Sequence, residues 1–297
     1  LVRVLKDMEM EGINLDVPAL RTFSAELEID INKLTIDIKT LAGIEDFNLD
    51  SPKQLGEVLF DHMKIDEKAK KTATGQYKTS EDVLSKLEGK HEIIPLILNY
   101  RSLRKLKSTY VDTLPELVEP STQRIHTSYM QTVAATGRLA SNNPNLQNIP
   151  VRTDLGKKVR RGFIASPGNV LVGADYSQVE LRLLAHFSQD RTMVSAFKNN
   201  QDIHAQTASE ILGVALKDVT SSDRSKAKAV NFGLMYGQSS FGLAKALRIS
   251  RGEAKDYITK YFERFSHVKS YLDSLKEDAE KTGYAITLHG RRRYLPD

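Results

Sequence analysis

The chain has 297 residues, of which 40% are hydrophobic and 27% charged, so it is long enough to form two domains with substantial cores. It contains no cysteine, which excludes disulfide bonds and thiolate metal sites and favours a cytoplasmic location. No apolar run is long enough to span a membrane, and the net charge of +5 is compatible with a polyanionic partner without being specific to one.

Two long helices are predicted in the first third of the chain, one starting at Asp16 with Pro18 in its first turn and one starting near Pro95. Each carries apolar residues at spacings of three and four, which indicates two stripes that pack on each other as an antiparallel pair. The first stripe is Leu20, Phe23, Leu27, Ile31, Leu34, Ile38 and Leu41, and the second is Leu96, Tyr100, Leu103, Leu106 and Tyr110.

The segment between these helices is predicted to hold a short capped helix at Ser51-Pro52 and a flexible basic loop over residues 68–78, which includes Thr74. Arg101, Arg104 and Lys105 are predicted on the exposed side of the second helix, where they would contact DNA phosphates irrespective of sequence. A solvated helix face without a ligand is the alternative for these cations. The same ambiguity applies to Lys157, Lys158, Arg160 and Arg161.

After Pro120 the apolar alternation predicts strands over 124–133, 159–164 and 170–174. Beyond Phe187 the chain is predicted to be mostly helical. It ends in a predicted hairpin of 284–288 and 291–295 that turns at His289-Gly290.

The strand predicted over 170–174 leads to Asp175, and a turn then leads into a helix. A carboxylate next to the backbone carbonyl of Tyr176 offers hard oxygen ligands of the kind that Mg²⁺ prefers. An N-cap or turn role is the alternative for Asp175. The alternative for Glu180 is a capping box with Ser177, three residues earlier.

A later segment, 224–237, places Arg224, Lys228, Phe232 and Tyr236 four residues apart, hence in one row on a helix. Since four residues rise about 6 Å, two cations can hold adjacent phosphates while a ring one turn on stacks under a base. Residues 220–223 would cap this helix and Gly237 would end it, which sets the positive end of the helix dipole near Arg224.

An alternative for the same helix is a basic surface helix whose rings face the core. Gly233 weighs against it, because a glycine inside a helix costs about 1 kcal/mol. The close approach of a flat group explains this glycine better.

Taken together, these segments resemble the family A DNA polymerases of the bacterial DNA polymerase I type. Residues 175–182 are similar to motif A of that family, and Arg224-x3-Lys228-x7-Tyr236-Gly237 is similar to motif B. The runs 136–141 and 143–150 resemble the segment before motif A, and residues 202–204 fall between the two motifs. Residues 51–56 and 72–81 resemble the family's thumb, so the likeness runs along the whole chain in order.

The resemblance implies a template-directed DNA polymerase that adds deoxynucleoside triphosphates to a primer 3′-hydroxyl by two-metal phosphoryl transfer. Asp175, with Tyr176 beside it, would hold Mg²⁺, and Arg224, Lys228 and His204 would hold the triphosphate. Phe232 would stack on the incoming sugar and base, its lack of a hydroxyl weighing against dideoxynucleotides. Tyr236 and Glu180 would pair beneath the sugar and exclude a 2′-hydroxyl, with Gln178 supporting the pocket.

Toward DNA, the resemblance implies that Arg138 probes the minor groove at the primer end, where the acceptors are nearly independent of sequence. DNA contacts are also implied for the thumb and the segment before motif A, at Gln147, Asn148, Arg101, Arg104, Lys105 and Thr74. The implied fold is α+β and predominantly helical, in a right-hand polymerase architecture. Residues 1–118 would form the helical thumb with a short palm-associated segment, 119–190 the first part of an antiparallel-sheet palm, and 191–297 the helical fingers.

The sequence departs from the family pattern at motif C, whose His-Asp pair supplies the second metal-binding carboxylate: no His-Asp dipeptide occurs in the chain. We therefore expect an incomplete, monomeric polymerase domain with weak or no catalysis of its own. Two alternatives remain open. One is a module that only binds primer-template DNA, and the other is a relative of the single-subunit RNA polymerases, which Glu180 beneath the sugar disfavours.

Overall fold

The computed structural model describes residues 1–151 and 153–295 and divides into two compact units, Leu1–Val172 and Gly173–Asp297. The boundary lies inside the segment predicted as palm. The division into thumb, palm and fingers stays a prediction.

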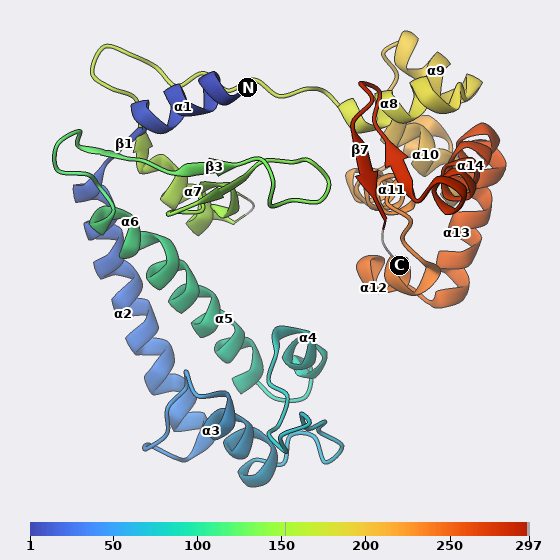
Figure 1. Ribbon diagram of the computed structural model, residues 1–297. Helices are drawn as coiled ribbons and strands as arrows, with labels where there is room; N and C mark the ends of the chain where they lie inside the picture. The colour runs from blue at the N-terminus through green and yellow to red at the C-terminus, as the bar shows by residue number, and fades with distance from the viewer. Residues whose placement is uncertain (152, 296–297) are drawn as a thin grey trace. The chain divides into compact units, whose positions relative to one another are not determined.

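The first unit is built on two long helices that lie side by side and run in opposite directions (Figure 1). Helix α2 (Val17–Ala42) starts at Asp16, whose Oδ1 accepts a hydrogen bond from the Ala19 amide at 3.0 Å. Helix α5 (Ile93–Leu106) continues through a π-helical turn, Lys107–Val111, into α6 (Thr113–Glu116). The predicted antiparallel pair is therefore confirmed.

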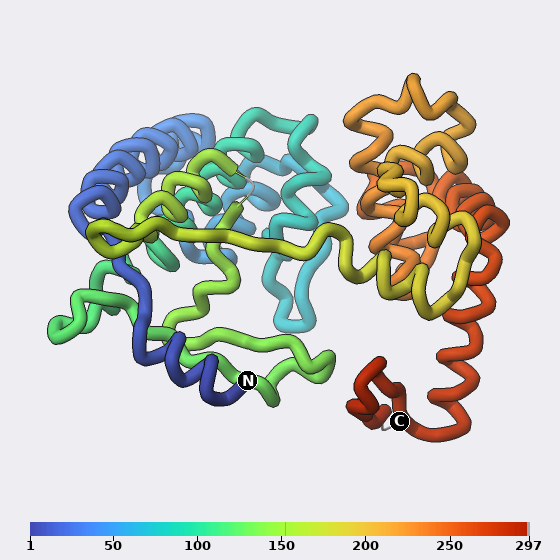
Figure 2. Tube along the Cα trace, turned by 90° about the horizontal axis from the view of Figure 1, so that it is seen from above, coloured from blue at the N-terminus to red at the C-terminus, as the bar shows by residue number. Residues whose placement is uncertain are grey.

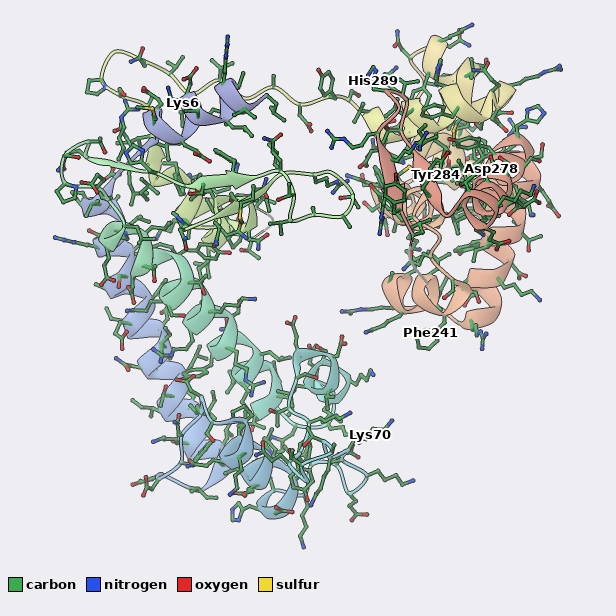
Figure 3. All side chains as sticks on the ribbon, in the orientation of Figure 1. Lys6, Lys70, Phe241, Asp278, Tyr284 and His289 are labelled. Carbon is green, nitrogen blue, oxygen red and sulfur yellow. The ribbon has the colours of Figure 1, made fainter. Side chains whose placement is uncertain are left out.

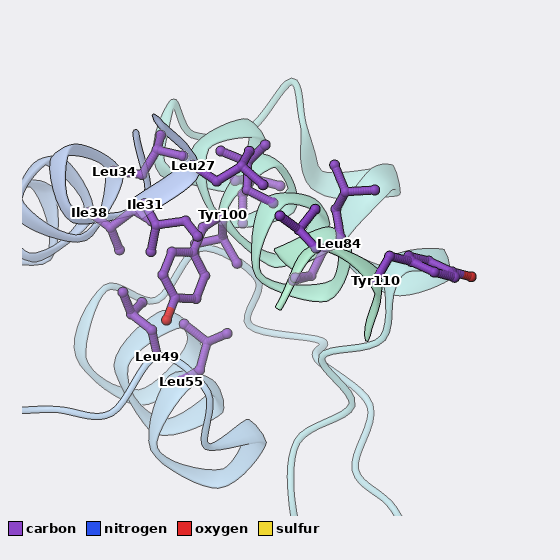
Figure 4. Close-up of a cluster of buried hydrophobic side chains, with 14 of the residues drawn as sticks. Leu27, Ile31, Leu34, Ile38, Leu49, Leu55, Leu84, Tyr100 and Tyr110 are labelled. Carbon is purple, nitrogen blue, oxygen red and sulfur yellow. The ribbon is translucent and has the colours of Figure 1, made fainter. Parts of the chain in front are cut away.

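The two apolar stripes form the core of this unit, and Figure 4 shows the side chains of Leu27, Ile31, Leu34 and Ile38 gathered with Tyr100. All members of the two predicted stripes pack in this core, although Leu41 and Leu96 are only partly buried. Ala42 takes the buried position at the end of α2, because a stripe on a straight helix drifts by about 20° per heptad.

At the far end of these helices, α3 (Pro52–Glu57) is capped by Ser51 as predicted and runs into a π-helical turn, Val58–His62. Helix α4 (Glu81–Leu84) follows later, with a 3₁₀ turn at Ser85–Leu87. Between them, residues 66–80 form a loop, here called the tip loop, in which Lys71 and Tyr77 make an isolated β-bridge. Lys70, labelled in Figure 3, belongs to this loop.

The small sheets of the first unit are antiparallel. The central strand β1 (Ile13–Leu15) pairs with β2 (Arg124–Ile125) and β5 (Phe163–Ile164), and β3 (Ser128–Met130) pairs with β4 (Ala140–Asn142). Helix α1 (Val2–Glu11) lies beside β3 (Figures 1 and 2), where Glu9 accepts a hydrogen bond from the Tyr129 amide at 2.5 Å. A 3₁₀ turn, Leu146–Asn148, and α7 (Asp154–Arg161) complete the unit.

One predicted strand is shorter than expected, and another is wrong. Residues 159–161 belong to α7, because Thr153 caps a helix there through the Gly156 amide at 3.1 Å, and only 163–164 are strand. Residues 170–174 form no strand and are exposed, with Val170 and Val172 at 80% and 85%. A strand needs a partner for its backbone N–H and C=O groups, and no strand of the described residues pairs with this segment.

The second unit is almost entirely helical (Figure 1). Its helices are α8 (Val179–Ser188), α9 (Arg191–Lys198), α10 (Ile203–Leu212), α11 (Ser221–Met235), α12 (Ser240–Leu247), α13 (Arg251–Arg264) and α14 (Ser266–Thr282), with a 3₁₀ turn at Leu216–Asp218. Tyr261 and Phe265 are the largest side chains in its core. The predicted hairpin is confirmed, with shorter strands β6 (Tyr284–Ile286) and β7 (Arg292–Tyr294), and Figure 3 labels Tyr284 and His289 on it.

The fold is therefore predominantly helical α+β with small antiparallel sheets, as predicted. Within the described residues, none of the helices combines the length and the apolar character needed to cross a membrane.

Candidate nucleotide and nucleic-acid site

Helix α11 carries the predicted row of functional side chains on a different face from the one that it buries. Its core face is Ala227, Val230, Asn231 and Leu234. Lys228 and Tyr236 are exposed, while Arg224 and Phe232 are partly exposed. The alternative in which the rings face the core is therefore wrong for Tyr236, which is 62% exposed.

Both ends of α11 are as predicted. Thr220 Oγ1 accepts a hydrogen bond from the Asp223 amide at 3.1 Å, and Asp223 Oδ2 accepts one from the Thr220 amide at 3.2 Å, which makes a reciprocal capping box. Gly237 follows the helix with a φ of 75°, a left-handed conformation that favours glycine. Arg224 thus stands in the first turn of α11, at the positive end of the helix dipole.

Gly233 has a close neighbour within its own unit that the sequence did not predict. A Cβ at this position would lie 2.1 Å from Oε1 of Gln238, so the glycine makes room for a side chain of the same unit. Gln238 is also 2.9 Å, at its Cγ, from a Cβ built on Gly242. The two glycines accommodate the Gln238 side chain, and no flat ligand is needed to explain them.

Arg224 is held by Asp202, the residue before α10. Arg224 Nε donates to Asp202 Oδ2 at 2.5 Å, while Oδ1 accepts from the amides of His204 and Ala205 at 3.0 and 3.2 Å. Burial raises the pKa of Asp202, but the hydrogen bonds from Arg224 and the helix amides outweigh it, so the pKa lies below its usual value. The guanidinium is therefore oriented by a carboxylate that stays ionised at neutral pH.

His204 is 2% exposed, and its Nδ1 lies 3.0 Å from Nδ2 of Asn231. Its ring centroid is 5.8 Å from that of Phe232. Burial, together with the nearby charges of Arg224 and Lys228, lowers the pKa of His204 to about 4, although Asp202 acts in the opposite direction. The imidazole is therefore neutral at pH 7, and the charge that would meet a triphosphate comes from Arg224 and Lys228.

Glu180 and Tyr236 meet, as predicted: Tyr236 Oη donates to Glu180 Oε1 at 2.6 Å. The capping-box alternative for Glu180 is wrong, because α8 begins after Gln178, and no side chain caps it. Gln178 itself adopts a left-handed conformation with a φ of 52°. Its contribution to a nucleotide pocket stays a prediction.

Asp175 and Tyr176 lie in the exposed segment that precedes α8, and Tyr176 is 82% exposed. Among the described residues, no three His, Asp or Glu side chains gather in a group that could hold a metal ion. Mg²⁺, however, commonly binds through one or two carboxylates together with substrate phosphates and water. The Asp175 carboxylate and the Tyr176 carbonyl are oxygen ligands of this kind, and their part in a metal site stays a prediction.

The residues predicted to contact DNA in the first unit differ in how they are held. Lys105, Arg138, Gln147 and Thr74 are exposed. Asn148 is exposed too, and its carbonyl accepts a hydrogen bond from Tyr110. Thr74 lies in the tip loop with its hydroxyl 2.9 Å from that of Thr72.

Arg101 is not on the exposed side as predicted. Its guanidinium is partly buried and donates to the carbonyl of Thr79 and, at 3.2 Å, to the Thr79 hydroxyl, which ties the tip loop to α5. Burial lowers the pKa of Arg101. Arg104 is paired with Asp50 at 2.9 Å, so Lys105 is the most open of the three predicted phosphate contacts.

The basic residues of α7 are engaged in part: Lys157 pairs with Asp154 at 2.9 Å, and Lys158 pairs with Glu26. The sequence reasoning missed Asn231 and Thr207, which surround His204, and Thr79, which holds Arg101. A signal for Asn231 was present, because a polar residue on the buried face of a helix requires a hydrogen-bond partner.

Comparison with known proteins gives one family. Residues 17–297 match the family model described as DNA polymerase family A. The chain is 51% identical over 297 residues to the DNA polymerase I of Caldicellulosiruptor bescii and 47% identical over 298 residues to that of Geobacillus stearothermophilus. Both alignments cover 100% of this chain but 35% and 34% of those proteins, so the chain spans about a third of the length of these curated relatives.

A solved structure is similar throughout. The POL domain of Pol1 from M. smegmatis, in complex with DNA primer-template and dNTP, superposes with a TM-score of 0.88 at 42% sequence identity. The alignment covers 99% of this chain and 52% of that one.

Proposed function

The chain belongs to DNA polymerase family A, and on that premise we propose that it forms part of a DNA-directed DNA polymerase. In this proposal, residues 1–118 serve as thumb, 119–190 as the first part of the palm and 191–297 as fingers, in a monomer that works on primer-template DNA. The curated relatives are DNA polymerase I enzymes, which favours this function over that of an RNA polymerase.

The contact between Glu180 and Tyr236 carries the proposal. It joins the motif A helix to the end of the motif B helix, beside the row Arg224, Lys228 and Phe232. A triphosphate lying along α11 would meet the two cations in the first two turns. The sugar would then lie toward Phe232 and the Glu180–Tyr236 pair, which would exclude a 2′-hydroxyl.

Asp175, with the Tyr176 carbonyl, would hold Mg²⁺ between the triphosphate and the primer end. When bound, the metal would activate the primer 3′-hydroxyl and neutralise charge on the phosphates. Arg224 and Lys228 would orient the phosphates for in-line attack, and neutral His204 would donate a hydrogen bond to them. Since the sequence holds no His-Asp dipeptide, we expect the 297 residues alone to bind nucleotide and duplex but to extend a primer weakly or not at all.

The test is a chimera in which these 297 residues replace the matching segment of the C. bescii DNA polymerase I. The chimera is expected to extend a primer with Mg²⁺ and deoxynucleotides, and Asp175→Asn is expected to abolish extension while leaving duplex affinity in place. A folded chimera that binds duplex without extending it would favour the second candidate, a DNA-binding module. The observation that favours this second candidate is the exposure of two cations, Lys105 and Arg138, which could contact DNA phosphates.

A further inference from the structure

A closed group of polar side chains lies in the core between α10 and α11. It consists of His204, Thr207 and Asn231, which are 2%, 0% and 0% exposed. Polar groups in such a place are costly unless they are hydrogen-bonded. The positions of their protons are therefore constrained by the partners that each group has.

The Thr207 hydroxyl has one proton, and its possible acceptors are the Ile203 carbonyl at 2.8 Å and Asn231 Oδ1 at 3.2 Å. Whichever of the two receives it, the hydroxyl oxygen can accept a hydrogen bond from Asn231 Nδ2, which lies 3.1 Å away. The second hydrogen of the same amide nitrogen remains for His204 Nδ1, at 3.0 Å. A neutral imidazole that accepts at Nδ1 carries its proton on Nε2.

We propose that Asn231 is a positioning residue that fixes His204 as the neutral tautomer protonated on Nε2, so that the ring offers an uncharged N–H donor to the nucleotide phosphates. The identity of the ligand, a nucleotide, rests on the proposed function. The assignment of the tautomer does not. The inference assigns a role to a residue that touches neither metal nor nucleotide.

The surroundings of the other ring nitrogen suit this role. Among the described residues, the fully enclosed polar atoms without a partner are Gln206 Oε1 and Tyr261 Oη. The hydrogen bond found for the His204 ring among the described residues is at Nδ1, so Nε2–H is left for a ligand. The nearby charged groups are Arg224, Lys228 and Asp202, and their combined effect with burial keeps the ring neutral.

The direct test is the ¹⁵N spectrum of the imidazole in the 297-residue chain without nucleotide, assigned with a His204→Gln sample. At pH 7 we expect Nδ1 to have the shift of an unprotonated nitrogen and Nε2 that of an N–H nitrogen. A proton on Nδ1, or a charged ring, would overturn the inference. Because no nucleotide is present, this result is independent of whether the chain binds one.

A variant separates positioning from packing. Asn231→Asp places a carboxylate, which can only accept, against Nδ1, so the ring is expected to take a proton there and its pKa to rise by about 1–3 units. Asn199→Asp, an exposed change of the same charge, is the control and should leave the ring unchanged. A folded Asn231→Asp protein with an unaltered His204 would contradict the inference, and if that variant does not fold, the spectrum of the unmodified chain still decides.

Titration with Mg²⁺ and dATP then tests whether His204 Nε2–H donates a hydrogen bond to the bound nucleotide. The unmodified chain should show the Nε2–H signal shift on binding, as a new hydrogen bond requires. Binding that leaves this signal unmoved would overturn the donor role, whereas an absence of binding with the tautomer as expected would count against the proposed function instead.

Discussion

Tyr236 and Glu180 lie 56 positions apart in the sequence, yet the Tyr236 hydroxyl donates to Glu180 Oε1 at 2.6 Å. Helix α8 is preceded by Gln178 and has no side-chain cap, so Glu180 does not form a capping box with Ser177. The pair therefore has no evident role in starting a helix. The pair lies at the end of the row formed by Arg224, Lys228 and Phe232, which is the position expected for side chains that exclude a 2′-hydroxyl in the proposed function.

Replacing Glu180 by Ala in the chimera is expected to weaken the exclusion of ribonucleotides. The ratio of kcat/KM for ribonucleotide to that for deoxynucleotide should rise by about 10–200-fold, the range over which a pocket discriminates one small group. Single-nucleotide primer extension measures it. Stability should fall by no more than about 1 kcal/mol, because Tyr236 is exposed and Glu180 is partly exposed. A large loss of stability without a change in nucleotide choice would return Glu180 to a structural role.

Asp202→Asn is expected to keep the cap of α10, since an amide oxygen can still accept from the His204 and Ala205 amides, but to lose the ion pair with Arg224. The folded pKa of Asp202 is lowered, so its contribution is present above the unfolded value near 3.9 and is lost as pH falls through the folded value. Urea unfolding between about pH 5.5 and pH 3.5 should therefore show a smaller loss of stability in the variant. The difference should be at most about 1 kcal/mol, as for a partly exposed pair, and equal acid sensitivity would argue against the pair.

His204 is expected to make the protein less stable in mild acid. Its folded pKa of about 4 lies below the unfolded value near 6.5, so the unfolded chain binds the proton first and stability falls as pH drops from about 6.5 toward 4. Between about pH 7.5 and pH 5 this amounts to about 2 kcal/mol. Urea unfolding at both pH values measures it, and His204→Gln should lack this component. An identical pH dependence in the variant would show that the ring is not buried in neutral form.

Lys105→Ala is expected to weaken duplex binding without affecting the fold, because the side chain is exposed. If it contacts one phosphate, the slope of log affinity against log salt should become shallower by about 0.9. Fluorescence anisotropy with a labelled primer-template across a salt series measures the slope. An unchanged slope would show that Lys105 contacts no phosphate and lies on a solvated helix face without a ligand.

Arg101→Ala is expected to behave differently from Lys105→Ala. Arg101 donates to the Thr79 carbonyl and hydroxyl, and Thr79 is 4% exposed. Removing it should lower the free energy of unfolding by about 1.5–3 kcal/mol, the usual range for hydrogen bonds to a charged group. Loss of DNA affinity with unchanged stability would instead support the direct phosphate contact first predicted for it.

Local signals in the sequence were sufficient to predict several of the helices. The spacing of Leu20 to Ile38 and the caps Asp16, Ser51 and Thr220 predicted helices that the structure has. The pairing of Glu180 with Tyr236 was reached through resemblance to a family, since no local pattern joins residues so far apart.

Strands and buried partners were harder to predict. A strand depends on what lies beside it, and the apolar run 170–174 has no partner strand among the described residues. Arg101 looked like a surface cation because its partner, Thr79, comes from the tip loop, which periodicity does not position. The Gln238 side chain, which follows the end of α11, occupies the space beside Gly233. The helix propensity of glycine alone does not predict such a contact.

The central claim is that a triphosphate lies along α11 with its phosphates at Arg224 and Lys228. Calorimetric titration of the 297-residue chain with Mg²⁺ and dATP tests it most directly, with Lys228→Ala compared to Lys226→Ala, a lysine of the same helix that pairs with Asp223 at 3.8 Å. We expect measurable binding that Lys228→Ala weakens by about 10–100-fold, as for a lost hydrogen bond to a charged group, and that Lys226→Ala leaves nearly unchanged. Equal losses in the two variants, or no binding by the unmodified chain, would contradict the account.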